Sequence, residues 1–243
     1  MKARPVIAQT RAELVLTLRR GESLIVTLAI PIGILVFFAK VDAIATDYAK
    51  PVDFLVPGVL ALAVMSAAMV SLGIATGFER RYGVLKRLGA TPLSRGGLLV
   101  AKTATILLLE ALQAVAIIAT GAALGWHVPG GVFAALGLLL LGTVAFAGVG
   151  LFFAGTLRAE ANLALANGLF LLLLFLGGMA YPLSKLPGPI EAFARLLPAA
   201  ALSECVRGVL ATGHSFPAGS FVVLAVWTVA APLAAIRCFR WEE

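Results

Sequence analysis

The chain has 243 residues, of which 61% are hydrophobic and 13% are charged, and its formal net charge is +7. Soluble domains average about half apolar and about a quarter charged residues, so this composition excludes a water-facing globule and indicates an integral membrane protein. A basic excess in a membrane protein ordinarily marks cytoplasmic loops, so we expect no nucleic-acid partner.

The basic N-terminal stretch lacks the apolar core and the small-residue cleavage site of a signal peptide, and we expect no removable leader. The two cysteines, Cys205 and Cys238, are too few for a disulfide scaffold. They also fall on opposite sides of the membrane in the topology below, so we expect no pairing between them.

Six apolar stretches are long enough to cross about 30 Å of hydrocarbon at about 1.5 Å per residue. The first carries Pro31, which a span tolerates where neighbouring helices satisfy the freed backbone groups. The third is long and predicts a tilt or a start on the membrane surface. The sequence therefore predicts one all-α membrane domain, residues 1–243, with spans at 23–39, 54–77, 98–124, 132–154, 161–180 and 218–236.

The basic residues orient these spans. With the N-terminus inside, the cytoplasmic segments hold 14 of the 19 Lys and Arg residues. The outer segments hold only Lys40, Lys50, Lys185, Arg195 and Arg207. Because cytoplasmic loops are enriched in Lys and Arg, both termini are expected in the cytoplasm.

The outer segment 181–217 contains two short helical patterns, about 189–197 and 199–211, separated by Pro198. Glu191 and Arg195 form an i,i+4 pair in the first pattern. Each pattern is too short to cross the bilayer, and both are more apolar than an ordinary loop. We predict a helical hairpin that dips into the outer interface.

The most charged run, residues 78–95, follows span two on the cytoplasmic side. As a helix it places Phe78, Tyr82, Leu85 and Leu88 in one stripe, with its basic residues mostly away from the stripe. Gly89 suits a helix C-cap and Thr91-Pro92 begins a turn. The residues alone favour equally a docking surface and a basic flank that only fixes orientation.

The stretch FERRYGVLKRLGATPLSRGGLLVAK, residues 78–102, resembles the coupling segment of ABC-2 type permeases, the membrane subunits of ATP-binding cassette exporters. The later stretch 177–210 resembles the family's segment after span five, with its aromatic-Pro, Leu-Pro and later Arg. The matching residues there are Tyr181, Pro182, Leu197, Pro198 and Arg207. The resemblance covers the whole chain, including a predicted surface helix over residues 4–20.

The resemblance implies that the segment 78–95 docks in a groove of a cytosolic ATPase and transmits its closure to the spans. The residues that the resemblance places in this coupling role are Glu79, Arg80, Arg81, Gly83, Leu85, Lys86, Arg87, Leu88, Thr91 and Pro92. The family architecture also implies two permease copies, meeting mainly through spans one and five, and two ATPase copies that use ATP and Mg²⁺. It further implies export across a prokaryotic cell membrane. The apolar lining and the lack of buried charge clusters favour an amphiphile such as a drug, an antibiotic or a lipid-like molecule, although the same family also moves polysaccharides.

Motifs for chemistry within the chain itself are not found. GGLLVAKT, residues 96–103, has Ala101 where a phosphate-binding loop needs glycine, and it enters an apolar span rather than following a strand. His127 and His214 are isolated, without Cys or carboxylate at metal-ligand spacing. We therefore expect no enzyme, no metal and no cofactor bound by this chain.

Glu110 lies near the middle of span three, with Gln113 on nearly the same helix face. An ionisable group at the bilayer centre costs about 3 kcal/mol or more, so it is expected to point into the bundle or a wet cavity. It is either part of a translocation path or a hydrogen-bonded structural residue. Asn162 and Asn167 in span five favour hydrogen bonds between helices, and the Gly and Ala residues of spans two and four favour packing surfaces.

The sequence therefore favours the permease of an ABC exporter. The rival is an ATP-independent secondary transporter or channel with Glu110 as its ion or proton site. Such transporters often contain internal repeats and broken spans, and the two halves of this chain show no repeat.

Overall fold

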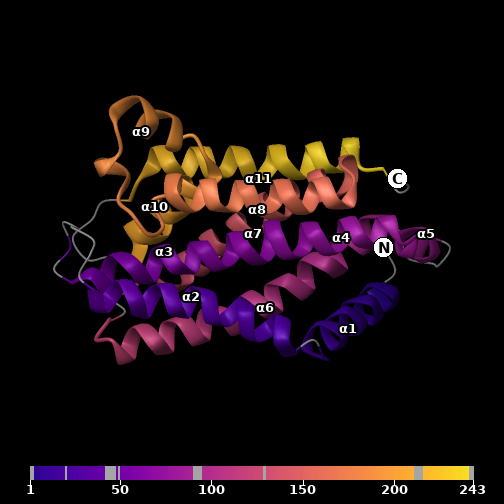
Figure 1. Cartoon of the computed structure of the whole chain (residues 1–243), viewed down its shortest axis with the longest axis horizontal. Coiled ribbons are helices and arrows are strands. Elements are labelled where there is room, and N and C mark those ends of the chain that lie inside the picture. The colour runs from indigo at the N-terminus through magenta and orange to yellow at the C-terminus, as the bar shows by residue number, and fades with distance from the viewer. Residues whose placement is uncertain are drawn as a thin grey trace.

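A computed structural model describes residues 3–19, 21–41, 48, 50–89, 95–127, 130–210 and 216–240. These residues fold into a helical bundle whose long helices run roughly along one axis (Figure 1). The first half of the chain forms α1 (Ala3–Arg19), α2 (Gly21–Val41), α3 (Pro51–Met65), the π-helical η1 (Ser66–Ser71), α4 (Leu72–Arg81), α5 (Val84–Gly89) and α6 (Arg95–Ala123). The second half forms α7 (Val132–Thr156), α8 (Ala159–Leu176), the 3-10 turn η2 (Leu183–Lys185), α9 (Gly188–Ala194), α10 (Pro198–Leu210) and α11 (Ala218–Cys238).

Within the described residues, five helices are long and apolar enough to cross a membrane: 51–81, 100–123, 132–156, 159–176 and 218–238. The helix α2 has a shorter described apolar stretch, Leu28–Val41. The all-helical class is thereby confirmed, and five of the six predicted spans coincide with helices long and apolar enough to cross a membrane. The six-span arrangement stays a prediction.

The continuous helix formed by α3, η1 and α4 lies at the centre of the bundle. In its most apolar window 83% of the residues are buried, against 17% in α11. Pro51 starts α3, where the missing N–H of proline is of no consequence. The apolar faces of α11 and α8 remain exposed, so lipid or another chain must cover them in a membrane.

Glycines allow the closest helix contacts, as small residues do at helix interfaces in membranes. A Cβ on Gly148 of α7 would lie 2.5 Å from the backbone nitrogen of Pro232 in α11. A Cβ on Gly150 would lie 2.5 Å from the carbonyl oxygen of Met69 in η1. The predicted role of span two and span four as packing surfaces is confirmed at these contacts.

The predicted outer hairpin consists of α9 and α10, which differ in burial. The helix α10 packs against α3, α7 and α11, and its Leu202 and Val206 are fully buried. Ile190 and Phe193 of α9 are exposed, Phe193 to 57%. The hairpin therefore has one helix inside the bundle and one on its surface.

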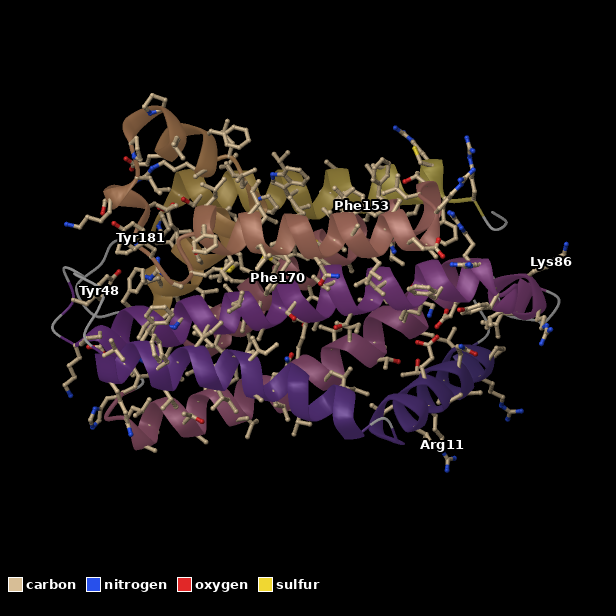
Figure 2. The ribbon with its side chains drawn as sticks, viewed as in Figure 1. Arg11, Tyr48, Lys86, Phe153, Phe170 and Tyr181 are labelled. Atoms are coloured by element: carbon tan, nitrogen blue, oxygen red, sulfur yellow. The ribbon has the colours of Figure 1, made fainter. Side chains whose placement is uncertain are left out.

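The two ends of the bundle carry different segments (Figure 1). One end holds α5 and both termini, and we call it the α5 end; the other holds α9 and η2, and we call it the α9 end. Figure 2 shows Arg11 and Lys86 toward the α5 end and Tyr48 and Tyr181 toward the α9 end. This agrees with the predicted placement of both termini on the same side as the segment 78–95.

Candidate coupling and translocation sites

The charged segment is two helices rather than one. The helix α4 ends at Arg81, Gly83 takes a left-handed conformation with φ of +68°, and α5 begins at Val84. The predicted continuous stripe over Phe78, Tyr82, Leu85 and Leu88 is therefore wrong, because the turn at Gly83 takes Leu85 and Leu88 out of register with Phe78 and Tyr82, whose rings still stack. Tyr82 is 67% exposed while Leu85 is fully buried. Glycine suits this turn because it populates positive φ without strain.

The carboxylate of Glu79 forms an ion pair inside the bundle. Its Oε2 lies 2.6 Å from Nζ of Lys102 in α6, and the same ammonium lies 3.2 Å from Oε1 of Glu13 in α1. The Lys102 side chain is only 2% exposed. One buried cation with two carboxylates thus joins α1, α4 and α6, and Lys102 belongs to this end of the bundle as a structural residue rather than a loop charge.

Arg80 was expected on the basic face of the segment, and this expectation is wrong. Its side chain is 5% exposed, and Nη2 donates to the carbonyl oxygen of Leu157 at 2.5 Å. The neighbouring Arg81 is exposed and forms an ion pair with Glu160 in the first turn of α8. Glu79, Arg80 and Arg81 therefore contact three different parts of the fold, which fixes the end of α4 before the chain turns into α5.

The basic face that remains exposed is small. Lys86 and Arg87 are exposed on α5 beside Val84, and Leu88 is half-buried. Leu85 is buried and holds α5 against the bundle. Thr91 and Pro92, also predicted to take part in coupling, lie outside the described residues.

The predicted N-terminal surface helix is α1, which packs against α6. Thr10 Oγ1 lies 3.5 Å from the carbonyl oxygen of Ala101, and Thr105 Oγ1 lies 3.5 Å from the carbonyl oxygen of Thr10. Arg11 is exposed, so the face of α1 that carries it points away from the bundle, as Figure 2 also shows.

The matched residues of the outer segment lie at the α9 end and have unequal environments. Tyr181 is exposed, Pro182 precedes η2, and Pro198 begins α10. Arg207 is buried: its Nη2 donates to the carbonyl oxygen of Gly178 at 2.7 Å, and its guanidinium carbon lies 3.9 Å from the centre of the Phe54 ring. Arg207 therefore joins α10 to the start of α3 and to the turn after α8.

Surface ion pairs complete the hairpin. Arg195 contacts Oε1 of Glu191 at 2.8 Å, which confirms the predicted i,i+4 pair, and its Nη1 lies 3.4 Å from Oε1 of Glu204. The hydrogen bond to Glu191 and the charge of Glu204 raise the pKa of Arg195 above its ordinary value. The guanidinium links α9 to α10 across the Pro198 junction.

Glu110 and Gln113 both point into the bundle. Glu110 is 8% exposed, and its Oε2 accepts a hydrogen bond of 2.5 Å from the hydroxyl of Thr143 in α7. Its Oε1 has no hydrogen-bond partner. Glu110 also lines a cavity of about 240 Å³ whose other walls come from α3, α6 and α7. Sequence reasoning missed Thr143, whose only signal is a hydroxyl in the middle of an apolar helix.

The comparisons with known proteins bear on most of the chain. The model of the ABC-2 type transporter family matches residues 5–211. The chain belongs to the ABC-2 type transporter family. The comparison with curated protein sequences gives no match.

The family and the apolar helices together make the chain a multi-pass membrane transport permease. Permeases of this family normally pair with an ATPase subunit, and the permease domain is the membrane component of the transporter. The matched region includes α1, the α5 segment and the outer hairpin as far as α10.

The two asparagines of α8 in the permease differ from each other. Asn162 is buried, and its Nδ2 donates to the carbonyl oxygen of Gly73 in α4 at 2.8 Å, as an interhelical bond was expected to do. Asn167 instead donates to Leu163 within its own helix and is exposed, so the same expectation is wrong there. Asn162 thus adds a further contact between α4 and α8.

Proposed function

We propose that the permease forms the translocation path of an ABC exporter for an amphiphilic substrate and is driven by separate ATPase subunits. Two ATPase copies, binding ATP and Mg²⁺, would dock beneath two permease copies in a prokaryotic cell membrane. Both termini and the α5 end would face the cytoplasm, since that orientation puts most Lys and Arg residues inside.

The observation that best supports this proposal is the anchoring of the end of α4. Glu79, Arg80 and Arg81 contact α6, the junction between α7 and α8, and α8 itself. A displacement of α5 would therefore be transmitted to several spans through short polar contacts, and would not be absorbed by a change of conformation in a loop. Coupling of this kind needs a surface that moves with the spans, and α5 supplies an exposed basic one.

The deciding experiment is co-purification of the permease with a candidate ABC ATPase subunit from the same organism, followed by an assay of vanadate-sensitive ATP hydrolysis. We expect a stable complex that hydrolyses ATP. A permease that purifies alone, and that moves solute in ATP-free vesicles under an ion gradient, would contradict the exporter.

The docking surface is tested by charge reversal at Lys86 and Arg87, the exposed basic residues of α5. The double variant Lys86→Glu/Arg87→Glu should insert normally into the membrane. The amount of ATPase that co-purifies with it should fall by about tenfold or more, because like charges across an interface are strongly unfavourable. Arg80 is unsuitable for this test since it is buried against Leu157.

The matched control for this test reverses two exposed lysines at the α9 end, in the variant Lys40→Glu/Lys185→Glu. It changes the charge by the same amount and should retain the ATPase. Equal retention by both variants would mean that α5 is not the docking surface.

A second candidate function rests on Glu110, whose unpartnered oxygen and buried setting suit a proton or cation site. In an ATP-independent transporter the variant Glu110→Gln would abolish transport and its pH dependence. In the exporter, Thr143 can still donate to the amide oxygen of the introduced glutamine, and ATP-driven transport should change by less than about threefold. Transport measured across pH in the two energised systems separates these outcomes.

A further inference from the structure

A second apolar cavity, of about 370 Å³, lies between α7, α8 and α11. Its size falls within the range of about 300–1,000 Å³ that is usual for pockets holding small molecules. Aromatic rings form much of its wall, among them Phe152 and Phe153 of α7 and Trp227 of α11. Figure 2 shows Phe153 at the seam between α8 and α11.

The cavity runs along the axis of the bundle. Near the midpoint of α11 it is lined by Trp227, whose indole Nε1 donates to the carbonyl oxygen of Leu196 at 3.0 Å. Toward the α5 end it reaches Ala234, and at about 1.5 Å per residue this interval of α11 spans about 10 Å. Toward the α9 end it continues to Leu173 of α8 and Pro198 of α10. The part of the cavity along α11 is therefore shorter than half of the hydrocarbon core, which is about 15 Å.

Three arginines lie just beyond the cavity at the α5 end. Arg237 follows Ala234 by less than one helical turn, and Arg158 follows Phe153 in the junction between α7 and α8. The backbone N–H of Arg240 donates to the carbonyl oxygen of Gly155 at 3.1 Å, which brings the segment after α11 against the end of α7. All three arginines are exposed.

The charge around these arginines is unbalanced among the described residues. Glu160, the nearest acidic residue in the sequence, already forms an ion pair with Arg81. Two further acidic residues, Glu242 and Glu243, end the sequence outside the described part of the chain. An apolar cavity that ends at exposed arginines is complementary to a phospholipid with an anionic headgroup, because the cavity can hold an acyl chain and the arginines can pair with the headgroup.

We propose that the seam between α8 and α11 binds one anionic phospholipid, with an acyl chain in the cavity and the headgroup on Arg158, Arg237 and Arg240. Basic sites between spanning helices are suited to such headgroups, because each Lys or Arg near the membrane surface attracts anionic lipid. In the orientation proposed above this lipid belongs to the cytoplasmic leaflet. The lipid site does not depend on the exporter function.

The test is native mass spectrometry of the full-length permease in detergent, titrated with phosphatidylglycerol or with phosphatidylcholine of the same acyl chains. We expect one phosphatidylglycerol per chain to bind at least about tenfold more tightly than phosphatidylcholine. The variant Arg158→Gln/Arg237→Gln/Arg240→Gln should abolish this preference.

A charge-matched control is Arg4→Gln/Arg11→Gln/Arg87→Gln, which removes three exposed arginines from the same end of the bundle. It should keep the tenfold preference. If it loses the preference as fully as the first variant, binding is a general attraction to basic surface and the proposal is wrong.

The acyl-chain position is tested separately, by Ala230→Phe, which fills the cavity, against Val226→Phe, on the exposed face of α11 outside it. Only the first should weaken phosphatidylglycerol binding, by about tenfold. Equal binding of both lipids, or a lipid bound equally well by both phenylalanine variants, would overturn the site. Size-exclusion profiles and helical circular dichroism establish that each variant is folded, and single arginine variants replace any triple variant that is not.

Discussion

The α5 end and the α9 end of the bundle both bury an arginine against a backbone carbonyl, but they are built differently around it. At the α5 end, Arg80 lies among ion pairs that join α1, α4, α6 and α8. At the α9 end, Arg207 of α10 lies over the Phe54 ring, and α10 is buried along most of its length. The α5 end is therefore held mainly by ion pairs, whereas the α9 end is held mainly by the apolar packing of α10.

The two ends differ in how easily their contacts can rearrange. Ion pairs that retain partial access to water can exchange partners at low cost, whereas a close-packed apolar core has few alternative arrangements. We therefore expect motion transmitted from α5 to change the ion pairs of the α5 end first, while α10 moves as a rigid unit. The following variants break one end at a time.

The largest expected effect is at the α9 end. Arg207→Leu leaves the carbonyl of Gly178 without its donor, at about 1–3 kcal/mol, and removes a desolvated cation–π contact of about 2 kcal/mol. For a chain of this size we expect the thermal unfolding midpoint in detergent to fall by roughly 6–20 °C. Differential scanning fluorimetry measures it.

Arg195→Leu is the matched control in the same segment. Arg195 is exposed, and surface ion pairs are worth about 0–1 kcal/mol, so the midpoint should move by less than about 4 °C. Similar shifts for the two variants would show that burial does not distinguish these arginines.

The next effect is at the α5 end. Lys102→Met leaves two carboxylates, of Glu13 and Glu79, without their shared cation. The loss should be roughly 2–4 kcal/mol, at or below the usual range for a broken buried pair, because both carboxylates keep partial access to water. Hydrogen exchange of the full chain should become faster in α1 and in the last turn of α4.

In that experiment the exchange of α10 should not change, and Lys86→Met on the exposed face of α5 should leave α1 protected. Unchanged exchange in α1 of the Lys102→Met variant would mean that the ion pairs do not hold this helix. Faster exchange in α10 as well would mean that the two ends are one cooperative unit.

The smallest effect concerns the contact between α4 and α8. Asn162→Ala removes the hydrogen bond to Gly73, and such interhelical bonds in membranes contribute about 0.6–1.7 kcal/mol. Asn167→Ala removes only a bond within α8 and should be close to neutral. Unfolding midpoints of the two variants measured side by side test this, and the reverse order of stability would contradict the assignment.

Much of the architecture could be predicted from residue patterns. Long apolar runs have to form helices in a bilayer because their backbone polar groups can be satisfied only within the helix. This argument predicted the five helices that are long and apolar enough to cross a membrane. Short helical patterns predicted both helices of the hairpin, and the resemblance predicted α1. It did not place the break at Gly83, because a basic amphipathic run reads as one helix until its flanking contacts are known.

The candidate site was predicted less completely. The resemblance placed Glu79, Arg80 and Arg81 in the coupling segment, and the helical pattern put the basic side chains of that segment mostly away from the apolar stripe. Arg80 instead bonds a carbonyl 77 residues away in the sequence, and Asn162 bonds one 89 residues away. Such partners have no signal within a helical period, so burial of Arg80 and exposure of Asn167 could not be read from spacing.

The sequence by itself determined the class of protein, the helices and the family, because hydrophobicity, charge and short motifs act locally along the chain. Only the tertiary structure decided which charged side chains are buried and which are exposed on the surface. That choice depends on carbonyls and counter-charges that distant helices bring together, as Leu157 does for Arg80 and Glu13 does for Lys102.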